Sequence, residues 1–200
     1  MVATRFTETF GCRHPLQQAG IGGVATPDLA IAVARAGGLG MLTGTVGHEA
    51  LAAQLDGLPA DGSIGVNFLV PFLDRTALDD ASNRSPYVEL FWGAPDADVI
   101  ETVHAGGARA GWQVGSADEA RAARDTGCDV IVAQGIEAGR ALGEDQSWAP
   151  DWPTSTSVGA VEARALYAGQ SVGAVRSRQP AAEIVAELVE KAERVLARTS

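Results

Sequence analysis

The residues best suited to chemistry in this sequence are glycines and amide side chains at the ends of apolar segments. Gly22 and Gly23 follow one such segment, Asn67 lies near the end of a second, and Gln134 ends a third. Glycine lets backbone N–H groups approach a ligand closely, and amides offer donors and acceptors without charge. This combination suits a flat heterocycle with polar edges. The alternative is that the glycines only serve the turns after strands.

Other kinds of active site find little support. His14, His48 and His104 fall in the N-terminal segment and in two expected helices, where surface or packing roles are the alternative to chemistry. Cys12 and Cys128 are far apart and outside any metal-binding spacing, so we expect two reduced thiols and no metal site. The sequence carries no HExxH or CxxC motif.

The charge balance excludes several partners. Fifteen Lys and Arg residues against 25 Asp and Glu give a formal net charge of −10, and the sequence has no basic block. Nucleic-acid binding needs a positive surface for the phosphates, so we expect none. The apolar runs are far shorter than the ~20 residues of a membrane helix, and the N-terminus lacks a signal-peptide pattern. We therefore expect a cytoplasmic protein with no membrane association.

Short apolar runs alternate with amphipathic segments over the first two thirds of the chain. Strands are expected over residues 15–19, 39–42, 63–70, 87–92, 108–114 and 129–134. Helices are expected between them, one with Thr26 as its N-cap and Pro27 in its first turn. A further amphipathic helix is expected over 180–198. Regular βαβα alternation predicts a parallel α/β sheet, either open and doubly wound or of TIM-barrel type.

The pattern predicts one domain over residues 1–200. Its βα units occupy 1–140, a Trp- and Pro-rich loop follows over 141–158, and a C-terminal helical segment covers 159–200. Since six units use the chain up to residue 140, the sequence stops short of the eight units of a closed barrel.

Several motifs stand in the order and spacing seen in nitronate monooxygenases, which this sequence resembles. They are QAGIGGVATP (18–27), AGGLG (36–40), GVN (65–67) and VAQGIEAG (132–139), and LYAGQSVG (166–173) is similar to the family's C-terminal segment. These FMN enzymes, once called 2-nitropropane dioxygenases, also resemble the flavin-dependent enoyl reductases of fatty-acid synthesis.

The resemblance implies a TIM-barrel-type fold, incomplete here at about six parallel strands, with FMN at the carboxyl ends of the strands. It implies oxidation of an alkyl nitronate with O2 to a carbonyl compound and nitrite. The positions that match the family's flavin contacts are Ile21, Gly22, Gly23, Asn67, Gln134, Gly135 and Gly139.

The sequence departs from the family where a catalytic base is usual. The family signature continues Glu-Ala-Gly-Gly-His, whereas here Gly139 is followed by Arg140 and Ala141. Ala141 therefore stands at the base position and no catalytic residue is assigned. Because a nitronate is already deprotonated, its oxidation does not require that base. We expect turnover of nitronates without turnover of neutral nitroalkanes. Arg140 either attracts the anionic substrate or faces solvent.

A second departure follows Gly139, where two βα units that hold the FMN phosphate are missing, as after an internal deletion. In barrels generally the loops after strands seven and eight form the phosphate site, so we expect weak FMN binding. Six strands leave two open edges, which predicts a homo-oligomer. Two alternatives stay open. One is a non-catalytic remnant acting as a binding or assembly module, and the other is an enoyl-reductase-like flavoenzyme.

Overall fold

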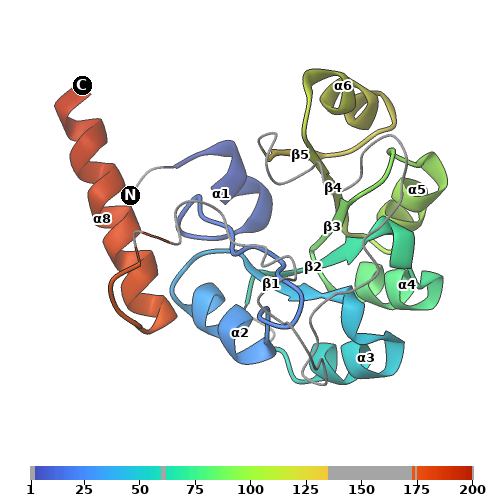
Figure 1. The fold of residues 1–200 in the computed structure, drawn as a ribbon, viewed down its shortest axis with the longest axis horizontal. Coiled ribbons are helices and arrows are strands. Elements are labelled where there is room, and N and C mark those ends of the chain that lie inside the picture. The colour runs from blue at the N-terminus through green and yellow to red at the C-terminus, as the bar shows by residue number, and fades with distance from the viewer. Residues whose placement is uncertain (1–2, 60–61, 135–172, 174, 200) are drawn as a thin grey trace, which may run out of the picture.

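The sheet consists of five parallel strands in a computed structural model that describes residues 3–59, 62–134, 173 and 175–199 (Figure 1). The strands lie in the order β1-β2-β3-β4-β5, the same as their order along the chain. A doubly wound sheet reverses its strand order, so an unbroken order is typical of a barrel wall. The strands are β1 (Gly40–Thr43), β2 (Ile64–Leu69), β3 (Tyr87–Phe91), β4 (Arg109–Val114) and β5 (Val130–Ala133).

Helices cover the outer face of this sheet and begin at polar caps. The side chains of Thr26, Asp74, Asp96 and Ser116 each accept a hydrogen bond from a backbone N–H of the helix that follows. Between the helices and the sheet lies the main apolar core, which includes Phe68, Leu78, Leu90, Val103 and Trp112. The outer helices are α2 (Pro27–Arg35), α3 (His48–Asp56), α4 (Arg75–Arg84), α5 (Ala97–Ala105) and α6 (Ala117–Asp125), with short 3₁₀ turns η1 (Gly44–Val46) and η2 (Val70–Phe72).

The amino-terminal end of the inner face is closed by α1 (Arg5–Phe10), a helix that sequence reasoning did not predict. The ring of Phe10 meets that of Tyr87 edge-on, with centroids 4.9 Å apart. Cys12, Leu39 and Met41 complete this second apolar cluster. The inner face is therefore a packed interior at this end.

The first expected strand, over 15–19, is not formed. A single parallel bridge joins Gln17 to Leu39, flanked by two backbone hydrogen bonds. Beyond it the side chain of Gln18 takes over, because its Nε2 donates to Met41 O (3.0 Å) and its Oε1 accepts from Met41 N (3.4 Å). A side-chain amide thus occupies the backbone groups that a continuing main-chain ladder would use. The other five expected strands are confirmed.

The C-terminal helix is confirmed as α8 (Ala181–Thr199), which packs against α2 (Figure 1). Val185 is buried, whereas Ile184 and Leu188 are 43% and 49% exposed. The expected loop over 141–158 and the first part of the expected C-terminal helical segment, 159–172, lie outside the described residues.

Helix α2 packs directly against the backbone of Gly40 in β1. A Cβ at Gly40 would lie 2.2 Å from Ala30 O and 2.8 Å from Ala30 C, which are backbone atoms of α2. We therefore expect Gly40→Ala to lower the free energy of unfolding by about 1–3 kcal/mol, measured by urea denaturation. Gly57→Ala is the matched control, since its Cβ would find its nearest neighbour at 3.6 Å. Equal stabilities of the two variants would contradict the packing argument.

Candidate functional site

The candidate site lies at the carboxyl edge of the sheet, where parallel strands place their ligands. The loop over 20–23 reaches this edge beside β1 and β2. A Cβ on Gly20 would lie 2.3 Å from Asn67 Cβ, and one on Gly22 would lie 3.8 Å from Thr45 Oγ1. Gly23 has a φ of +73°, a left-handed conformation that favours glycine. Ile21 is 52% exposed in this loop.

Asn67 faces the inner side of the sheet, beneath Gly20. Its side chain is 2% exposed, and its Nδ2 donates to Glu89 Oε1 at 3.1 Å. The structure therefore brings this predicted residue together with the glycine loop. It also commits one of its amide hydrogens to a residue that sequence reasoning missed.

That residue, Glu89, is fully buried in the middle of β3. It accepts hydrogen bonds from Asn67, Gln17 (2.6 Å), Tyr87 (3.1 Å) and Gln113. Its place inside the apolar run YVELF could have marked Glu89 as a site residue, because a buried charge needs polar partners. Sequence reasoning did not use this signal.

Gln134 extends β5 at the same edge, with its backbone N–H donating to Val114 O at 2.9 Å. Its Oε1 is buried and has no hydrogen-bond partner among the described residues, and the same holds for Gln113 Oε1. Buried carbonyl oxygens are normally paired, so two unpaired ones suit a ligand edge that donates. The ring of FMN carries one N–H, at N3, which matches one of these two acceptors. Gly135, Gly139 and Ala141 lie outside the described residues.

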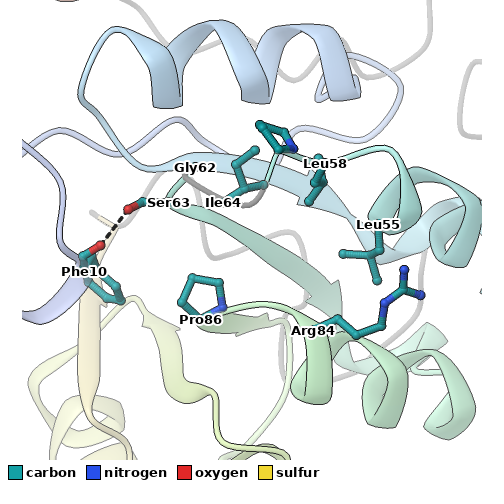
Figure 2. A pocket seen from close by; sticks show the side chains of 9 residues that line it. Phe10, Leu55, Leu58, Gly62, Ser63, Ile64, Arg84 and Pro86 are labelled. Carbon is teal, nitrogen blue, oxygen red and sulfur yellow. Dashed lines mark hydrogen bonds between the residues drawn. The ribbon is translucent and has the colours of Figure 1, made fainter.

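A cavity of about 430 Å³ lies at the opposite, amino-terminal edge (Figure 2). Ser63 and Pro86, which precede β2 and β3, line it, and Ser63 Oγ donates to Phe10 O at 2.7 Å. Arg84 also lines it but is engaged in ion pairs with Asp56 and Asp80. Of the predicted flavin contacts that the structure describes, none lines this cavity, so it is separate from that part of the candidate site.

Burial controls the acid–base behaviour of the inner face. It raises the pKa of Tyr87 well above its ordinary value, and the neighbouring Glu89 adds to the shift. Burial likewise raises the pKa of Cys12, and that of Cys128 to about 11, where Asp129 contributes. Both cysteines are free. The raised pKa values keep the thiols protonated at neutral pH, so they do not supply thiolate nucleophiles.

Across the residues that the structure describes, no cluster of three or more His, Cys, Asp or Glu side chains is placed to bind a metal ion. In the same part of the chain, no helix combines the length and apolar character needed to cross a membrane.

The strand order and the covering helices define the class of the protein as α/β of TIM-barrel type. A solved structure of FabK from Thermotoga maritima is similar, with a TM-score of 0.61 and 29% sequence identity over 69% of this chain and 46% of that one. The family model of nitronate monooxygenase matches residues 3–76. The chain is thus related to the nitronate monooxygenase family, and the resemblance predicted from its motifs is confirmed.

Two curated relatives extend this comparison. A nitronate monooxygenase of Pseudomonas aeruginosa is 30% identical over 178 residues, covering 68% of this chain and 51% of the relative. The (3aS,4S,5R,7aS)-5-hydroxy-7a-methyl-1-oxo-octahydro-1H-indene-4-carboxyl-CoA dehydrogenase of Rhodococcus jostii is 30% identical over 183 residues, covering 86% of this chain and 52% of the relative. The chain spans about half the length of these relatives.

The buried Tyr87 makes stability depend on alkaline pH. Because its pKa is higher in the folded state, an unfolded chain releases this proton first as the pH rises. The contribution of Tyr87 to the free energy of unfolding is therefore complete below about pH 10, the ordinary pKa of tyrosine, and is lost as the pH rises above it. We expect Tyr87→Phe to lower the free energy of unfolding by about 1–2 kcal/mol at neutral pH, through the lost hydrogen bond to Glu89. We also expect a shallower decline than in the wild type between pH 10 and 11.

Urea denaturation across this pH range measures both effects. Cys12→Ala is the control, because it removes a different group with a raised pKa that does not contribute to the raised pKa of Tyr87. Parallel declines of the wild type and Tyr87→Phe would show that Tyr87 is not the titrating group.

Proposed function

We propose that the chain is a flavin-dependent oxidoreductase of nitronate monooxygenase type, which binds FMN at the carboxyl edge of its strands and oxidises alkyl nitronates with O2. The observation that carries the proposal is the pair of buried, unpaired amide oxygens on Gln113 and Gln134. They lie at the same edge as the glycine loop, in a chain related to this family. A cytoplasmic location is part of the proposal and rests on the sequence alone.

The residues that would hold the flavin ring are those matched to the family's contacts. Backbone groups at Ile21, Gly22 and Gly23 would lie along the ring, and Asn67 and Gln134 would address its polar edge. Gly135 and Gly139 complete the proposed set. When bound, FMN would supply the electron transfer between nitronate and O2. The chain itself would orient the ring and hold the donors and acceptors around it.

Ala141 at the base position limits the proposed substrates. A methyl group cannot take a proton from a neutral nitroalkane, whereas a nitronate has already lost that proton. The proposed substrate is therefore the anionic nitronate, and Arg140 would either attract it or face solvent.

The relative from Rhodococcus jostii favours a second candidate substrate. Its alignment covers 86% of this chain, more than that of the nitronate monooxygenase, and its printed name specifies a carboxyl-CoA dehydrogenase. A thioester of coenzyme A is thus the alternative substrate class. The enoyl-reductase-like alternative requires NAD(P)H, and the non-catalytic alternative requires neither turnover nor flavin.

The first test is titration of the purified chain with FMN, followed by absorbance and by quenching of flavin fluorescence. We expect saturable binding, weaker than that of the Pseudomonas aeruginosa relative measured alongside, because the sequence pattern lacks the two βα units predicted to hold the FMN phosphate. With flavin bound, alkyl nitronates should consume O2 and release nitrite, and the matching neutral nitroalkanes should not.

Each alternative has its own outcome in that test. Equal rates on nitronate and neutral nitroalkane would contradict the role given to Ala141. Oxidation of NAD(P)H or of a CoA thioester without nitrite release would favour the other enzymes. A chain that binds no FMN, and is colourless once the excess flavin has been removed, would identify a non-catalytic module.

Self-association is part of the same proposal, since a partial barrel leaves β5 at the edge of the described sheet. Ile131 on this strand is 39% exposed, an unusual position for a residue in a parallel sheet. We expect a dimer by light scattering, and a shift toward monomer in Ile131→Lys. Ala53→Lys adds the same charge on the exposed side of α3 and serves as control. A monomeric wild type would contradict this part of the proposal.

A further inference from the structure

Glu89 is a buried acid that the proposed chemistry does not use. It is 0% exposed, and no ion pair reaches it within the described parts of the chain. Its Oε2 accepts from Gln17 Nε2 (2.6 Å) and Tyr87 Oη (3.1 Å), and its Oε1 accepts from Asn67 Nδ2 (3.1 Å) and Gln113 Nε2. Burying an acid is costly, so this arrangement calls for a reason beyond filling the interior.

These hydrogen bonds determine which way each amide faces. A primary amide has its two donors on nitrogen and its acceptor on oxygen, so fixing one end fixes the other. Because Gln113 Nε2 donates to Glu89, Gln113 Oε1 must point away from the carboxylate. That oxygen is buried and lacks a hydrogen-bond partner among the residues described.

The unpaired oxygen of Gln113 lies close to the end of the sheet where the flavin is proposed. Gln113 is in register with Val132 of β5, and Gln134 follows two residues later on that strand. Side chains two apart in a strand share a face, so Gln113 and Gln134 belong to the same inner face on neighbouring strands. Each has a buried side-chain oxygen with no hydrogen-bond donor among the described residues.

We propose that Glu89 is a positioning residue of this site. It holds the amide of Gln113 so that Oε1 accepts a hydrogen bond from an N–H on the edge of a bound heterocycle. Gln113 thereby joins Gln134 as a binding residue, and Glu89 acts through it without touching the ligand. The inference rests on the proposed function, because it takes FMN as the heterocycle.

A carboxylate is the side chain that enforces this orientation. It offers acceptors at both oxygens, so every amide around it must present its nitrogen. A glutamine at position 89 would present an acceptor and a donor, and one of the surrounding amides would then turn around. The acid therefore converts flexible amides into a fixed pattern of acceptors toward the ligand.

Comparison of FMN with 3-methyl-FMN tests the inference by binding alone. The oxidised isoalloxazine ring has a single ring N–H, at N3, and the methyl derivative lacks it. The two dissociation constants are measured by fluorescence quenching for the wild type, Gln113→Leu, Glu89→Leu and Gln17→Leu. Gln17→Leu is the matched control, because it removes an amide donor to the other oxygen of Glu89 and leaves Gln113 held.

We expect the wild type to prefer FMN by about tenfold, as befits one buried hydrogen bond. Gln113→Leu and Glu89→Leu should both lose this preference, and Gln17→Leu should keep it. A merely structural Glu89 would alter stability without altering the ratio of the two constants. Circular dichroism monitors folding. Should Glu89→Leu not fold, Glu89→Asp takes its place, since it retains the charge and withdraws the carboxylate from Gln113.

Different outcomes would contradict different parts of the inference. A wild type that binds both flavins equally, or a Gln113→Leu variant that still prefers FMN, overturns the contact to Gln113. A Glu89 variant that keeps the preference lost in Gln113→Leu overturns the positioning role. A wild type that binds neither flavin overturns the proposed function and this inference with it.

Discussion

The burial of one carboxylate is the constraint on which the inner face depends. Glu89 can stay inside the sheet only if its oxygens are satisfied, and the donors that satisfy them come from β2, β3, β4 and the segment before α2. Each of these segments is thereby tied to the same point. The register of the strands, the position of the bridge at Gln17 and the orientation of Asn67 all have to agree with that requirement.

The glycines of the inner face leave the space that the ring of Tyr87 needs. Tyr87 lies across two of them, since a Cβ would come within 2.9 Å of its ring at Gly65 and within 2.1 Å of its hydroxyl at Gly111. Only glycine leaves room for an aromatic ring at this level. The ring then reaches Glu89 on one side and Phe10 on the other. The amino-terminal half of the interior is accordingly filled, and the polar groups are displaced toward the carboxyl edge, where TIM-barrel-type proteins carry out their chemistry.

Sequence reasoning succeeded where the signal was local. Periodicity predicted five strands, and periodicity together with the cap at Thr26 predicted most of the outer helices, because these features depend on residues a few positions apart. The family motifs predicted Asn67 and the glycine loop, which do lie together. Glu89 stood out locally only as an acid in an apolar run, and its role could not be predicted because most of its partners are distant, Gln17 being 72 positions away. The strand over 15–19 was wrongly predicted because no propensity tells that the side chain of Gln18 replaces the main chain.

That substitution at Gln18 has a consequence for the order in which the fold opens. The segment before the glycine loop is attached by two backbone hydrogen bonds to Leu39 and by the side chains of Gln17 and Gln18, whereas the strands of the sheet share continuous ladders. Local opening follows the weakest attachment, so we expect amide hydrogens of this segment to exchange with solvent ahead of those in β2 and β3. The loop over 20–23 can then be released and re-seated while the rest of the sheet stays folded. A ligand held by that loop would gain its access through a partial unfolding event confined to the N-terminal edge.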